Sequence, residues 1–163
     1  MKGFTLIEII IYMALLSLTI GFILVGVYQI LDSKTGVLAR TSVEEEANFL
    51  MKKIKWALTN VDAINQPAAA TTSTTLSVNK FNFPSNPVVI NLSGSDINIT
   101  YAANPAVILN SEDVAIKELV FENISSGSNP AVKIKLAVEY KPSDLKTMKP
   151  STTIETTIYL RKQ

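Results

Sequence analysis

The sequence predicts an α+β protein, with one long N-terminal helix followed by an antiparallel β-sheet. Three patterns support this class. Residues 4–31 are almost wholly apolar, residues 43–61 repeat apolar side chains at helical spacing, and residues 76–162 alternate apolar with polar side chains as strands do. A helix with one apolar stripe and a sheet with one apolar face bury each other. We therefore expect the second half of the helix to pack on the sheet.

The composition narrows the possible classes of function. The chain has 163 residues, with 15 Lys and Arg against 14 Asp and Glu, for a net charge of +1. Such a balance argues against broad electrostatic capture of nucleic acid. The chain has no cysteine and no histidine, so it lacks disulfides, thiolate chemistry and the commonest general base and metal ligand. We expect a non-enzymatic protein that uses neither a cofactor nor a metal.

The N-terminal stretch is long and apolar enough to cross a bilayer as a helix. After Lys2 no basic residue occurs until Lys34, and Glu8 is the only acid before Asp32. On insertion scales a charge at mid-membrane costs roughly 2.5–3.5 kcal/mol, so an isolated acid there indicates a function with a partner. Glu8 is therefore the first candidate functional residue.

Three interpretations of this stretch are open. A secretory signal peptide has an apolar region of about 7–15 residues and a small-x-small cleavage site, whereas the apolar run here is about twice as long. A plain signal anchor fits the length but leaves Gly3, Phe4 and Glu8 unexplained. The third interpretation uses all three residues, because Gly3-Phe4-Thr5-Leu6-Ile7-Glu8 resembles the N-terminal signature of the type IV pilin-like proteins.

The resemblance implies a processing site and an assembly contact. A prepilin peptidase of that family would cut between Gly3 and Phe4, remove residues 1–3 as a leader and methylate the new amino group of Phe4. The family glutamate corresponds to Glu8, which pairs with the amino terminus of a neighbouring subunit during filament assembly. Glu8 lies one helical turn, about 6 Å, after Phe4, and low dielectric strengthens a carboxylate–ammonium pair. The alternatives are a pair within the same subunit and a snorkelling residue with no role.

One departure from the family pattern bears on the kind of subunit. Many major pilins carry a proline inside this helix, but here no proline occurs before Pro67, and Val25 stands where we would look for it. This difference favours a minor pilin or a minor pseudopilin over a main filament subunit.

We expect residues 32–163 to form a headgroup outside the membrane, with an amphipathic helix at 37–64 and a sheet at 76–162. Pro67 cannot continue the helix. Phe49 and Trp56 are seven residues apart and flank the apolar stripe, so we interpret them as the edge of the helix–sheet contact and not as a ligand platform. The apolar stripe of the helix comprises Val43, Ala47, Leu50, Ile54, Leu58 and Val61.

Turn signals divide the sheet. Residues 67–75 are predicted to form a surface loop, and residues 76–83 a strand. Residues 88–92 and 97–101 alternate on either side of a turn and predict a hairpin. A strand at 114–124 changes face near Glu118, which indicates a bulge or a break. Further strands are predicted at residues 107–109, 132–140 and 152–161.

Two charged clusters in the headgroup were weighed as ligand sites. Asp96, Glu112 and Asp113 lie in predicted turns and carry oxygen ligands suited to calcium, but they lack EF-hand spacing and are common turn residues. The second cluster lies among acids and has no interleaved aromatic residue, so a solvated strand face is favoured over DNA capture. Its members are Lys133, Lys135, Lys141, Lys146 and Lys149.

The leading hypothesis is a structural minor pilin or pseudopilin subunit of a type IV pilus, a type II secretion pseudopilus or a DNA-uptake filament. It would sit in the inner (cytoplasmic) membrane and then enter a periplasmic or cell-surface filament. Its partners would be other pilin or pseudopilin subunits, the prepilin peptidase/methyltransferase and the inner-membrane assembly machinery. The alternatives are a filament-displayed adhesin or DNA-binding module, and a membrane-anchored protein unrelated to filaments.

Overall fold

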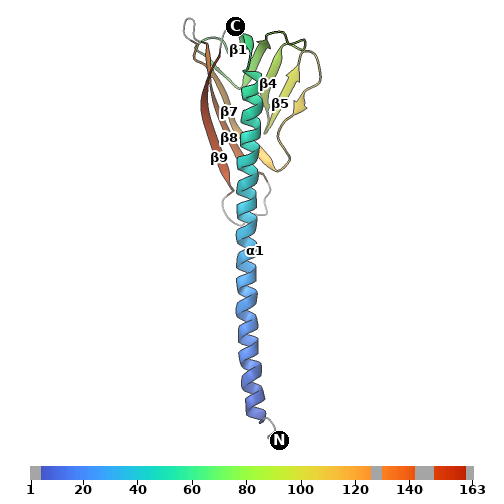
Figure 1. The fold of residues 1–163 in the computed structure, drawn as a ribbon, viewed down its shortest axis with the longest axis vertical. Coiled ribbons are helices and arrows are strands. Elements are labelled where there is room, and N and C mark those ends of the chain that lie inside the picture. Colours follow the sequence, from blue (N-terminus) through green and yellow to red (C-terminus); the bar gives the residue numbers. More distant parts are fainter. Residues whose placement is uncertain (1–4, 126–129, 142–148, 161–163) are drawn as a thin grey trace. The chain divides into compact units, whose positions relative to one another are not determined.

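The computed structural model describes residues 5–125, 130–141 and 149–160. It divides into two compact units, Met1–Leu38 and Ala39–Gln163. Helix α1 (Leu6–Ala57) is a single helix of 52 residues and belongs to both units. After it, the strands of the described residues form two antiparallel sheets (Figure 1). The predicted α+β class, a long N-terminal helix packed on antiparallel β-structure, is confirmed.

The first unit consists of the N-terminal part of α1. This part contains a stretch that is long and apolar enough to cross a membrane, and none of that stretch is buried within the described structure. Two of its hydroxyl groups bond to the backbone of the same helix, since Ser17 Oγ donates to Met13 O at 2.8 Å and Thr19 Oγ1 donates to Leu15 O at 2.8 Å. Such local bonds are what an apolar environment requires of polar side chains in a helix.

The helix ends at Ala57, seven residues before the end predicted at residue 64. Asn60 adopts a left-handed backbone conformation, with φ 58°, which stops the helix as Asn often does. Lys80 Nζ then donates to the carbonyl oxygens of Trp56 and Thr59, two acceptors at the end of the helix. Residues after Asn60 form strand β1 (Val61–Gln66), so Val61 is wrongly placed in the predicted helical stripe.

The core lies in the second unit, where the last turns of α1 face both sheets (Figure 1). The predicted stripe is confirmed from Val43 to Leu58, since its five members are buried. Both sheets contribute one apolar face to the same cluster. Its largest fully buried members from the sheets are Leu76, Ile90, Ile97, Ile99, Leu119, Phe121, Ile134 and Leu136.

The first sheet has the strand order β1-β3-β4-β5-β6. Its further strands are β3 (Thr75–Lys80), β4 (Val88–Ser93), β5 (Asp96–Tyr101) and β6 (Val107–Ile108). The predicted hairpin is confirmed by β4 and β5, which are joined by a two-residue loop between the paired Ser93 and Asp96. Gly94 has φ 64° in this loop, a conformation that glycine adopts without steric cost.

The second sheet has the order β2-β7-β8-β9, formed by β2 (Thr72–Ser73), β7 (Val114–Asn123), β8 (Ala131–Tyr140) and β9 (Ser151–Tyr159). Strand β2 lies inside the segment that was predicted to be a loop. The bulge predicted near Glu118 is confirmed, because the pairing of β7 with β8 shifts between Ile116 and Glu118. The connections between the predicted strands 114–124, 132–140 and 152–161 fall partly on residues 126–129 and 142–148, outside the described residues.

The prediction of one sheet is therefore wrong, and the buried side chain of Asn110 explains the division. Its Oδ1 accepts from Ile97 N at 2.8 Å, and its Nδ2 donates to Asp96 Oδ1 at 3.0 Å and to Val114 O at 3.4 Å. These bonds hold the connection between β5 of one sheet and β7 of the other. The chain thus leaves the first sheet after β6 and starts a second one.

We predict that Lys80→Met lowers the free energy of unfolding by about 1–3 kcal/mol, because it removes the side-chain donor of Thr59 O and one of the two donors of Trp56 O at the end of α1. Lys80 is 8% exposed, and burial lowers the pKa of its ammonium group. Urea unfolding of the full chain in detergent, followed by circular dichroism, measures the change. Lys117→Met is the control, since its side chain is more than half exposed; equal stability of Lys80→Met and the wild type would contradict the role given to Lys80.

Candidate functional site

The first candidate site lies at the start of α1. Gly3 and Phe4, the residues of the expected processing site, lie outside the described residues. Thr5 precedes the first helical residue, and Glu8 N donates to Thr5 O at 3.1 Å and to Thr5 Oγ1 at 3.4 Å. Thr5 thus caps the helix, with the Thr-x-x-Glu spacing of a capping box. A carboxylate in the first turn is also favoured by the helix dipole.

The carboxylate of Glu8 has one side-chain partner in the described chain. Tyr12 lies one turn later, and its hydroxyl donates to Glu8 Oε1 at 3.1 Å. A carboxylate accepts about four hydrogen bonds, so the phenol uses only part of this capacity and leaves the charge unneutralised. Sequence reasoning missed Tyr12; the signal was a phenol four residues after the only acid of an apolar helix.

Next to this pair the helix surface forms an apolar groove of about 270 Å³, lined by Ile9, Tyr12, Met13 and Leu16. Its lining residues recur at spacings of three or four and are all exposed. A surface of this kind suits a lipid chain or the side chains of another apolar helix.

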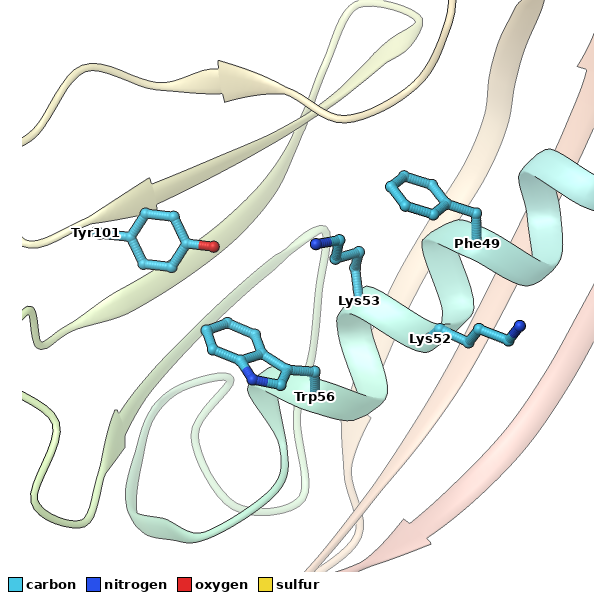
Figure 2. A pocket seen from close by; sticks show the side chains of 5 residues that line it. All are labelled: Phe49, Lys52, Lys53, Trp56 and Tyr101. Atoms are coloured by element: carbon cyan, nitrogen blue, oxygen red, sulfur yellow. The ribbon is translucent and has the colours of Figure 1, made fainter.

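The second candidate site is a groove of about 370 Å³ in the compact unit Ala39–Gln163. Figure 2 shows Trp56 and Lys53 of α1 on the side of Tyr101, which belongs to β5. We call it the aromatic groove, and its lining residues are Phe49, Lys52, Lys53, Trp56 and Tyr101.

One wall of the aromatic groove consists of aromatic rings that contact each other edge to face. The Trp56 ring meets the rings of Phe83 and Tyr101 at centroid distances of 6.1 Å, with interplanar angles of 80° and 73°. Lys80 Nζ lies 4.4 Å from the Trp56 ring centroid. The predicted place of Trp56 at the edge of the helix–sheet contact is confirmed.

Phe49 differs from that prediction. Its side chain is 42% exposed, and the ring is covered on one side by Lys53, whose Nζ lies 5.6 Å from the ring centroid. The aromatic groove therefore combines an exposed ring with two ammonium groups, a combination that binds acidic and apolar groups together.

Several residues of the two charged clusters are paired within the described chain. Within the part of the chain that the structure describes, no group of three acidic residues could hold a metal ion. Asp96 instead accepts from Asn110, as described above.

The lysines of β8 are paired across the sheet. Lys133 Nζ lies 2.6 Å from Glu155 Oε1, and Lys135 Nζ lies 2.8 Å from Glu118 Oε2. The hydrogen bond with Glu155 and then its charge raise the pKa of Lys133, and the same pair lowers the pKa of Glu155. These pairs match the prediction of a solvated strand face. Lys146 lies outside the described residues.

Comparisons with protein-family models, with curated proteins and with solved structures found no match for this chain. No relative therefore assigns a role to Glu8, to Tyr12 or to the aromatic groove.

We predict that Phe49→Ala changes the free energy of unfolding by no more than about 0.5 kcal/mol, as exposed positions usually do. Phe83→Ala is the matched comparison, and it is expected to cost about 1–3 kcal/mol because the ring supports both Trp56 and Tyr101. Trp56 is the only tryptophan, so its fluorescence reports unfolding of this unit in the full chain. A large cost for Phe49→Ala would instead make Phe49 a structural residue.

Proposed function

We propose that this chain is a pilin-like filament subunit, of the minor pilin or minor pseudopilin kind. In this proposal the prepilin peptidase cuts between Gly3 and Phe4 and methylates Phe4. Residues 4–31 hold the subunit in the inner membrane until it enters an envelope-spanning filament, or its tip. The filament is a type IV pilus, a type II secretion pseudopilus or a DNA-uptake filament.

The observation that carries the proposal is the isolated carboxylate of Glu8 in an exposed apolar helix. Large apolar side chains from Leu6 to Leu31 are exposed, so lipid or other helices must cover them. Glu8 is the only acid among them, and its hydrogen bond comes from the neutral phenol of Tyr12.

A carboxylate in such surroundings needs a cation. Removal of residues 1–3 takes Lys2 away, and Lys34 lies 26 residues beyond Glu8, about 39 Å along the helix. The amino group of Phe4 is then the cation that each subunit supplies near this depth. One amino terminus per Glu8 allows each carboxylate to pair with the terminus of a neighbouring subunit, which is the pairing that we propose.

The second unit supports a structural role for the rest of the chain. Its apolar stripe and both sheets form one core, and the lysines of β8 are paired with acids. We therefore give the compact unit the role of the headgroup, and a nucleic-acid role gains no support from β8.

We predict that Glu8→Gln leaves the amount of membrane-bound chain unchanged but lowers the amount in sheared filaments at least tenfold. A charge-assisted bond is worth about 1.5–3 kcal/mol, which corresponds to about a 10- to 150-fold change. The measurement is quantitative immunoblotting of membrane and filament fractions from cells that produce the chain with its own assembly machinery.

Tyr12→Phe is the matched control, because it removes the phenol hydroxyl but keeps the carboxylate. We expect a smaller loss, of about two- to tenfold, from one neutral hydrogen bond. Normal assembly of Glu8→Gln would contradict the proposal and favour a pair within one subunit or a residue without a role.

A further inference from the structure

We propose that the aromatic groove binds helix α1 of a second copy of this chain, displaced by seven residues, so that Glu45 of the second copy meets Lys52 of the first. This inference rests on the proposed function, because it takes both copies to be anchored in one membrane through their N-terminal helices.

The part of α1 that belongs to the compact unit Ala39–Gln163 carries a second line of side chains, distinct from the buried stripe. Its members recur at spacings of three and four, and all of them are exposed. This alternation is the spacing of a coiled-coil seam, which lets one helix pack along another. We call this line the outer seam, and it consists of Ser42, Glu45, Phe49, Lys52 and Trp56.

Of the three consecutive glutamates of α1, only Glu45 belongs to the outer seam. Glu44 accepts from Arg40 Nε at 3.1 Å, and Glu46 accepts from Ser111 N at 3.1 Å. Among the described residues neither Glu45 nor Lys52 has an ion pair or a side-chain hydrogen bond. They lie about 10.5 Å apart along the axis, too far to pair with each other in one helix.

The charges of Glu45 and Lys52 determine the axial displacement between the α1 helices of two copies. Both copies enter the same membrane by their N-terminal helices, so their α1 helices run in the same direction. Without displacement, Glu45 would face Glu45 and Lys52 would face Lys52, which is repulsive. A displacement of seven residues, about 10.5 Å, places Glu45 opposite Lys52 and Phe49 opposite Trp56.

The aromatic groove matches what this register brings to it. The carboxylate of the incoming Glu45 meets the ammonium groups of Lys52 and Lys53, which line the groove. The ring of the incoming Phe49 reaches the level of Trp56 and Tyr101, whose own rings form the aromatic wall (Figure 2). Each copy therefore carries the groove at Lys52 and Trp56. Seven residues earlier it carries Glu45 and Phe49, the side chains that fill the groove of another copy.

Such a contact joins the end of one outer seam that carries Lys52 and Trp56 to the end of the other that carries Glu45 and Phe49. Because both ends lie on the same face of α1, each copy takes one neighbour through this seam, and the contact gives a staggered pair. The outer seam would thus set the axial step between two neighbouring copies, separately from the Glu8 contact in the membrane.

Cysteine cross-linking tests this register directly, because the chain has no cysteine of its own. Two tagged full-length copies, one with Ser42→Cys and one with Phe49→Cys, are produced together and oxidised in intact cells; both keep Glu45 and Lys52. The seven-residue displacement places Ser42 of the incoming copy opposite Phe49 of the other, so we expect a disulfide-linked dimer, which is lost when both copies carry Ser42→Cys or both carry Phe49→Cys. The reason is that a disulfide needs Cα atoms within about 7 Å.

Asn48→Cys with Lys55→Cys is the matched control. These two exposed positions are also seven residues apart, but each lies about 120° round the helix from its counterpart in the test pair, Ser42 or Phe49. Equal linking of this pair, equal linking of same-position pairs, or linking of Ser42→Cys to a different protein would each overturn the proposal. If both cysteine variants enter filaments and no Ser42–Phe49 link forms, this inference is overturned and the proposed function stands.

A charge exchange provides a second readout. Glu45→Lys alone and Lys52→Glu alone are each expected to lower co-purification of two differently tagged copies by about two- to fivefold, as for exposed ion pairs. The double variant restores the pairing with its charges exchanged and is expected to recover. Lys55→Glu makes the same charge change on another face and should have no effect; failure of the double variant to recover would overturn the register.

Discussion

The apolar side chains of α1 must be shielded from water along its whole length, and the rest of the structure depends on this requirement. From Val43 to Leu58 the cover comes from two sheets, which bury the stripe completely. From Leu6 to Leu31 the large apolar side chains are exposed in the described structure, so their cover comes from outside the chain. At about 25 cal/mol per Å² of apolar surface, leaving such a stretch in water is prohibitive. A membrane or other helices supply the only favourable surroundings.

Within the compact unit, two buried polar side chains shape the fold. Lys80 reaches back across 24 residues to the carbonyl of Trp56, which fixes where α1 stops and the first strand begins. Asn110 satisfies backbone groups of β5 and β7, which fixes where one sheet gives way to the other. Both groups act at positions that an apolar pattern leaves undefined.

Local patterns were enough to predict much of this structure. The stripe from Val43 to Ile54, the hairpin at Gly94 and the bulge at Glu118 all follow from spacing within a few residues. The end of α1 at Ala57 and the division into two sheets did not follow, because Lys80 and Asn110 act on residues distant in the sequence. The helical spacing of apolar residues also includes Val61. That spacing alone favours a helix, but Val61 pairs with Lys80 of β3 and lies in a strand.

The candidate sites show the same division. Glu8 can be identified as a candidate from the sequence alone, because it is the only acidic residue in a long apolar stretch. Its partner Tyr12 and the surroundings of Phe49 are visible only in the side-chain geometry, since a period alone cannot tell which flanking aromatic residue meets a ring of the sheet. Trp56 and Phe49 are similarly exposed, at 40% and 42%, but Trp56 contacts Phe83 and Tyr101, whereas the ring of Phe49 is contacted by Lys53. Function in this protein is thus inferred from the parts of α1 that its own sheets leave uncovered.

The most direct test of the pilin-like proposal is the mass of the N-terminal peptide of the chain, isolated from the membranes of cells that produce it naturally. The proposal predicts that this peptide begins at Phe4 and carries one methyl group on its amino nitrogen. A peptide that begins at Met1 or Lys2, with no methylated Phe4, would contradict it and would make α1 a plain membrane anchor.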